Sequence, residues 1–154
     1  MKLDTSAAPE IAILSGELDA AAEAGAVPGT PTGPATIGYL AACLRLLVAD
    51  PQSWWGLVRF DPQRPVRIPV TAPGPGCEAW LLVLPPGHQG DGRPDGPDWV
   101  VACLVAGAMA EHTGPGCRPL SHGRTMVRGG RRPAGMVNAG GGYAVSLHAR
   151  SFPL

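Results

Sequence analysis

The chain has 154 residues, enough for one domain that buries about two-thirds of its surface without disulfides or a structural metal. Its 12 basic residues balance 12 acidic ones, which argues against nucleic acid or an acidic membrane surface as a partner. No signal segment opens the chain and no apolar run approaches the ~18 residues of a membrane span, so a cytoplasmic protein is expected.

The first part of the chain differs in composition from the rest. Residues 8–25 favour a helix that ends near Gly25, although their narrow apolar face leaves a mobile arm as the alternative. The following VPGTPTGP stretch predicts a linker. We therefore divide the chain into an N-terminal arm and linker over 1–34 and a folded domain over 35–154.

The folded domain is expected to begin with a helix. Thr36 is the predicted N-cap of IGYLAACLRLLVAD, where apolar residues recur at helical spacing up to Pro51. Trp54 and Trp55 are expected to seat this helix on the rest of the domain.

From Arg67 onward the pattern changes to short strands separated by turns rich in glycine and proline. An all-β domain, folded as a small closed barrel behind a helical lead-in, accounts for this pattern most simply. The runs over 79–84 and 99–106 are almost continuously apolar, as expected where both faces of a strand are covered. The predicted strands are RIPV, EAWLLVL, WVVACLVAG, GRTMV and GYAVSLHARSF.

The cysteines form no CxxC pair and have no zinc-ligand spacing. We therefore expect free thiols, with Cys43 and Cys103 buried as small hydrophobic residues.

Two stretches carry motif residues at fixed spacing. Gly87 and Gly107 match the first cupin motif, G-x5-H-x-H-x3,4-E-x6-G, and Gly123 and Asn138 match the second, G-x5-P-x-G-x2-H-x3-N. WLLVLPPGHQGDGRPDG resembles a stretch of the bacterial cysteine dioxygenase family without a gap, and VNAGGGYAVSLHARSFPL resembles its ending. The resemblance covers roughly residues 36–154. It implies a cupin-type β-barrel, or jelly roll, with N-terminal helices.

The resemblance fails at the metal ligands. Three histidines hold ferrous iron in that family, and Arg93, Asp95 and Ala134 occupy their positions here. A protonated guanidinium cannot ligate a metal, and one carboxylate does not make an iron site. Other polar residues lie in or beside predicted turns at spacings that match no ligand pattern, namely His88, Asp91, Glu111, His112 and His122. We therefore expect no metal and no other cofactor.

Other family positions keep polar residues. Arg67 matches the arginine that grips the substrate carboxylate, His148 belongs to the SLH motif, and Arg150 replaces a near-terminal tyrosine. Strand alternation places Ser146, His148 and Arg150 on one face, which the resemblance directs into the barrel.

Buried charges must pair or bind a charged ligand, which leaves two interpretations. In the first, Asp95 forms a structural ion pair with Arg93 or Arg150. In the second, Arg67, Arg93 and Arg150 bind an anionic small molecule. The predicted substrate-binding residues are Arg67, Arg93, Arg150, Trp80 and Trp99, although both tryptophans would also suit a core.

Three functions are consistent with this pattern. We favour a metal-independent enzyme of specialised metabolism that catalyses a non-oxidative cyclisation, isomerisation or elimination of an anionic small molecule. His148, whose pKa should lie near neutrality, would transfer protons, and Asp95 would assist it. The alternatives are a ligand-binding pseudoenzyme and a thiol dioxygenase with an unusual metal site. The polar replacements at 93, 95 and 150 favour an enzyme, since a site that had only lost its function would more often be filled with apolar residues. A homodimer is also consistent with the sequence.

Overall fold

The computed structural model describes residues 33–90, 99–113, 115–129 and 134–152. The helix expected over 8–25 lies outside these residues, as do Arg93, Asp95 and Asp91. Within them, no helix has the length and apolar character needed to cross a membrane.

The predicted helix is confirmed as α2 (Ile37–Ala49). It begins at Thr36, whose hydroxyl accepts a hydrogen bond from the backbone N–H of Tyr39 at 3.2 Å. Two 3-10 turns follow, η1 (Pro51–Ser53) and η2 (Trp55–Leu57). Trp54 lies buried between them and donates to the Leu47 carbonyl at 2.6 Å, so it seats the helix as predicted. Trp55 packs edge to face on Trp54 with 5.7 Å between ring centroids, but it is 48% exposed and buries less of its ring.

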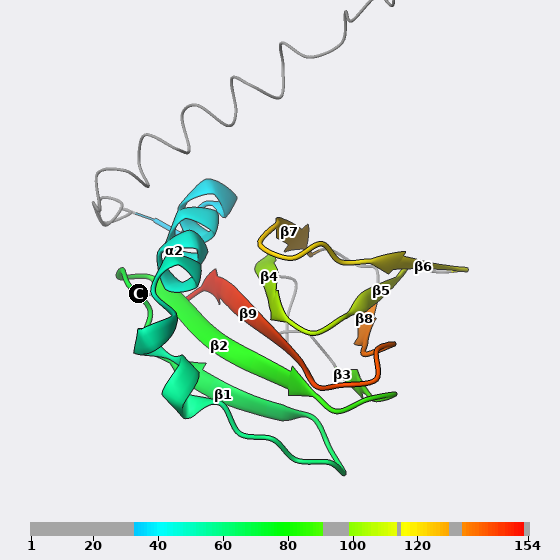
Figure 1. Cartoon of the computed structure of the whole chain (residues 1–154). Helices are drawn as coiled ribbons and strands as arrows, with labels where there is room; N and C mark the ends of the chain where they lie inside the picture. The colour runs from blue at the N-terminus through cyan, green and yellow to red at the C-terminus, as the bar shows by residue number, and fades with distance from the viewer. Residues whose placement is uncertain (1–32, 91–98, 114, 130–133, 153–154) are drawn as a thin grey trace, which may run out of the picture.

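Two antiparallel sheets make up the rest of the domain (Figure 1). The five-stranded sheet has the order β1 (Val66–Val70), β2 (Cys77–Leu84), β9 (Ala144–Ser151), β4 (Val100–Ala106), β7 (Thr125–Arg128). The four-stranded sheet has the order β3 (Gln89–Gly90), β8 (Ala134–Val137), β5 (Ala110–Thr113), β6 (Gly116–Pro119). All five predicted strands belong to the larger sheet, and the strands of the smaller sheet were not predicted.

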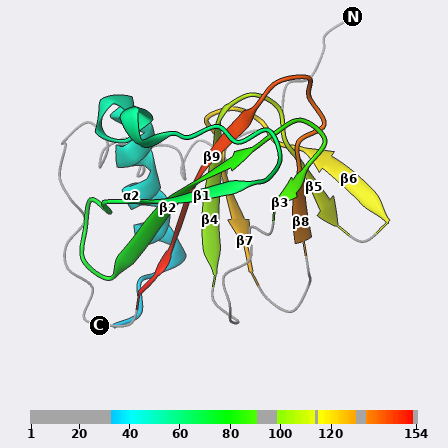
Figure 2. The same ribbon diagram turned by 90° about the horizontal axis from the view of Figure 1, so that it is seen from below.

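The five-stranded sheet is covered on both sides (Figure 2). Helix α2 packs on its outer face, where Leu40, Cys43 and Leu44 join Leu81 and Leu147 in one core. The four-stranded sheet faces its inner side, where a second apolar cluster lies between the sheets. This explains the continuous apolar runs of β2 and β4, since both faces of each strand are buried. Cys43 and Cys103 are buried, as predicted.

Two motif residues that are not metal ligands, Gly107 and Asn138, stabilise turns of the backbone. Gly107 has φ +76°, and a Cβ atom at this position would overlap the backbone oxygen of Tyr143. The buried Asn138 side chain donates to the carbonyls of Leu84 at 2.9 Å and Gly142 at 2.7 Å, and accepts from the N–H of Gly140 at 2.9 Å. These residues are therefore needed for the loops that join the strands, independently of any metal.

Candidate functional site

Polar side chains gather on the inner face of β2 and β9, between the two sheets. Residues that pair across antiparallel strands share a face, and the register pairs Trp80 with His148 and Glu78 with Arg150. Alternation along β9 adds Ser146 to this face, and Arg67 reaches it from β1. We call this set the inner polar face. It consists of Arg67, Glu78, Trp80, Ser146, His148 and Arg150.

His148 is the most enclosed member of the inner polar face. Its ring is 0% exposed and stacks on Trp80, with 5.3 Å between ring centroids and 13° between planes. Its Nε2 lies 2.7 Å from the Ser146 hydroxyl. Its Nδ1 is buried and has no hydrogen-bond partner among the described residues. A buried polar atom without a partner is costly, so this nitrogen is the least satisfied atom of the inner polar face.

The environment of His148 keeps its ring neutral. Burial, followed by the positive charges of Arg128 and Arg67, lowers its pKa from 6.5 to about 3. The expectation of a pKa near neutrality is therefore wrong, because the sequence does not reveal how deeply the ring is buried. A neutral imidazole donates through one nitrogen and accepts through the other, but its remaining N–H proton is not acidic enough for it to act as a general acid at pH 7.

Glu78 joins the two arginines of the inner polar face. Arg150 donates through Nε to Glu78 Oε2 at 2.6 Å, while Arg67 Nη2 lies 3.8 Å from Oε1 of the same carboxylate. The Arg67 guanidinium carbon lies 4.1 Å from the centroid of the Trp80 ring, a cation–π distance. Arg150 thus pairs with Glu78, which was not among the predicted site residues, where Asp95 was the predicted partner. The position of Glu78 two residues before Trp80 on the same strand is the signal that would have identified it.

A second ion pair connects the two sheets. Arg128 on β7 donates through Nε to Glu111 Oε1 on β5 at 3.2 Å, and both side chains are nearly buried. Burial lowers the pKa of Arg128, and Glu111 opposes this shift. The sequence analysis placed Glu111 in or beside a turn, whereas it lies within β5. Arg128 was not considered, although it shares a strand face with Met126.

The remaining predicted residues occupy separate places. Trp99 is 50% exposed and packs on Gly129, where an added Cβ atom would overlap its ring. The structure therefore places Trp99 near the surface, whereas Trp80 is buried in the interior. Arg93 and Asp95 are outside the described residues, and the same holds for the side chain of Ala134.

The described residues do not fit a metal ion. No three His, Cys, Asp or Glu side chains converge in the described part of the chain. His88 Nδ1 lies 3.1 Å from the Pro86 carbonyl, and His122 Nε2 lies 2.6 Å from the Gly107 carbonyl. The carboxylates of Glu78 and Glu111 both face guanidinium groups. These two carboxylates are therefore engaged by arginines in the described part of the chain, and neither belongs to a group of metal-ligating side chains.

Comparison with solved structures identifies the fold. The TT1209 protein of Thermus thermophilus matches with a TM-score of 0.54 and 21% identity, over 64% of this chain and 92% of that protein. The cupin domain of an XRE family transcriptional regulator from Enterobacter cloacae matches with a TM-score of 0.51 and 15% identity, over 60% of this chain and 100% of that domain. A cupin superfamily protein from Desulfitobacterium hafniense matches with a TM-score of 0.52 and 8% identity, over 65% of this chain and 88% of that protein. The domain has the cupin fold. No family model matches the sequence, and no curated protein does.

Proposed function

We propose that this cupin domain binds an anionic small molecule at the inner polar face without a metal. The observation that carries the proposal is the position of Arg67. Its side chain is 43% exposed, and Trp80 supports its guanidinium from one side. Its distance to Glu78, 3.8 Å, is long for an ion pair, so Arg67 keeps donors for a carboxylate that approaches from solvent.

The charges around the inner polar face favour an anion. Arg67, Arg128 and Arg150 carry three positive charges, Glu78 and Glu111 carry two negative charges, and His148 is neutral. One positive charge is left over among these groups. A bound monoanion would balance it, which lowers the cost of keeping the charges out of water.

Binding alone accounts for these features better than proton transfer by His148. A group with a pKa of about 3 is a weak base at pH 7 and is not an acid at that pH. The structure of this site therefore favours a ligand-binding protein, which the sequence analysis ranked second, over the enzyme that it ranked first.

A metal-independent enzyme is the second candidate, and the unpartnered Nδ1 of His148 favours it. If the Ser146 hydroxyl donates to Nε2, then Nδ1 carries the ring proton. A neutral imidazole in this state stabilises an oxyanion by a hydrogen bond, as an isomerisation or elimination on a carboxylate compound requires. The proton itself would need another carrier, for which Asp95 remains the prediction.

Titration calorimetry on chelator-treated protein tests the proposal, with pyruvate, succinate and L-cysteine as carboxylate probes. The protein for this titration carries Arg118→Gln and Arg124→Gln, which remove the two arginines of a separate surface pocket. We expect at least one probe to bind, and Arg67→Ala to weaken that binding by at least about tenfold, since a charge-assisted hydrogen bond is lost. Arg64→Ala is the matched control because it removes an exposed arginine from a turn. Binding that survives Arg67→Ala unchanged, or that requires ferrous ion, would contradict the proposal.

A further inference from the structure

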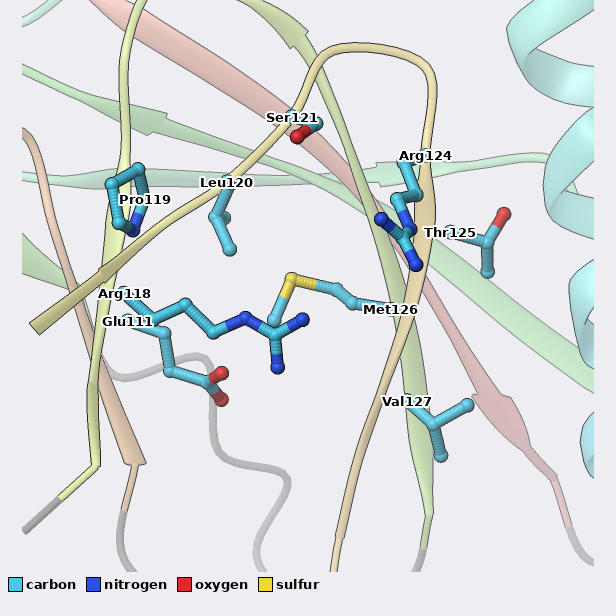
Figure 3. Close-up of a pocket in the computed structure, with 9 residues that line it drawn as sticks. All are labelled: Glu111, Arg118, Pro119, Leu120, Ser121, Arg124, Thr125, Met126 and Val127. Carbon is cyan, nitrogen blue, oxygen red and sulfur yellow. The ribbon is translucent and has the colours of Figure 1, made fainter. Parts of the chain in front are cut away.

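A pocket lies between an edge strand of one sheet and an edge strand of the other (Figure 3). Strand β6 ends the four-stranded sheet and β7 ends the five-stranded sheet, and the pocket opens between them. Its volume is about 200 Å³. Its lining includes Glu111, Arg118, Ser121, Arg124, Thr125 and Met126. It shares none of its lining with the inner polar face.

Two guanidinium groups enter this β6–β7 pocket from different sides. Figure 3 shows Arg118 extending from β6 and Arg124 from the segment before β7, with the head groups of both directed into the space. Neither has a carboxylate partner among the described residues. Four other arginines do have one within 3.8 Å, namely Arg64, Arg67, Arg128 and Arg150. Two further described arginines, Arg45 and Arg59, also lack a carboxylate partner, but neither lines this pocket.

The carboxylate nearest to Arg118 along the sheet is already engaged. Glu111 is its direct partner across β5 and β6, a position from which opposite charges normally interact. However, Glu111 accepts from Arg128 at 3.2 Å. Glu111 therefore pairs with the buried Arg128, and no ion pair joins it to Arg118.

The pocket has room for a small oxyanion. Leu120 and Met126 supply apolar surface beside the arginines, whereas the Thr125 hydroxyl is directed away from them (Figure 3). The volume corresponds to about seven water molecules at roughly 30 Å³ each, which is enough for a phosphate or a short dicarboxylate. Arginine forks bind both groups through two parallel hydrogen bonds. We infer that the β6–β7 pocket is a second binding site, which takes a small oxyanion between Arg118 and Arg124.

Nitrogen–proton NMR of the arginine Nε–H groups tests this inference in the full chain. Inorganic phosphate and succinate are titrated separately at constant ionic strength. We expect saturable shifts of Arg118 and Arg124 with a Kd of about 1 mM or below for at least one probe. A response to phosphate alone identifies a phosphate site, and a response to succinate alone identifies a carboxylate site. Linear shifts with both probes would overturn the inference.

Variants separate this pocket from other positive surface. Arg118→Gln and Arg124→Gln should each weaken binding by at least about tenfold, while Arg64→Gln should leave it unchanged. Both pocket arginines are exposed, so the backbone amide spectrum should show an intact fold. Arg67→Ala should leave oxyanion binding at this pocket intact. The test of this pocket can therefore fail or succeed independently of the test of the proposed function. Equal weakening by Arg64→Gln would mean general charge attraction and would also overturn the inference.

Discussion

Lowering the pH from 7 to 5 should reduce the free energy of unfolding by about 2 kcal/mol through His148 alone. In the folded protein, burial and two arginines hold the pKa of His148 at about 3, against 6.5 without these effects. Between these two values the unfolded chain takes up a proton that the folded chain does not. Protonation therefore favours the unfolded state, and stability falls as the pH drops below 6.5.

The size of the effect follows from the unfolded state. At pH 5 the folded ring is still neutral, while the unfolded histidine is almost fully protonated. For a group with an unfolded pKa near 6.5, the loss between pH 7 and pH 5 is about 2 kcal/mol at 25 °C. It continues at about 1.4 kcal/mol per pH unit and levels off near pH 3. The interval above pH 5 is the useful one, because carboxylates titrate mainly below it.

Urea unfolding at the two pH values measures the effect. The variant His148→Gln keeps a group able to bond Ser146 but cannot titrate, so it should lose about 2 kcal/mol less than the wild type between pH 7 and pH 5. His112→Gln removes an exposed histidine from β5 and should keep the wild-type pH dependence.

A direct measurement protects this test against a variant that folds poorly. In the folded wild type, the NMR signals of the His148 ring should not titrate between pH 8 and pH 5. If the ring titrates near pH 6.5, or if His148→Gln shows the full wild-type pH dependence, then the ring is not in the dry, cationic environment described above.

Three further predictions concern the retained motif residues and the metal. Asn138→Ala should cost about 2 kcal/mol in urea unfolding, because the buried Leu84 carbonyl and two partly buried backbone groups lose their partner. Gly107→Ala should lower the melting temperature markedly through overlap with Tyr143, whereas Gly141→Ala, with open space around its Cβ position, should not. Elemental analysis should find less than one iron per chain, and ferrous ion should not induce oxygen uptake with L-cysteine. Tightly bound stoichiometric iron, or chelator-sensitive uptake, would refute this last prediction.

Local patterns were sufficient to predict one half of the β-structure but not the other. The strands of the five-stranded sheet have apolar runs or alternation that are visible in any short window. The strands of the four-stranded sheet are AEHT, GCRP, AGMV and a two-residue bridge at Gln89 and Gly90. Such segments have little strand propensity of their own, and they become strands because their neighbours in the fold supply hydrogen-bond partners.

For the inner polar face, too, some features follow from the sequence and others only from the tertiary structure. By itself, the sequence determined helix α2, the strands of the larger sheet and the shared face of Ser146, His148 and Arg150, because these follow from the periods of helix and strand. The tertiary structure alone decided that Glu78 pairs with Arg150, 72 residues away, and that His148 is neutral. Ion pairs and pKa values depend on burial and on charges brought close from distant strands, which no local pattern encodes.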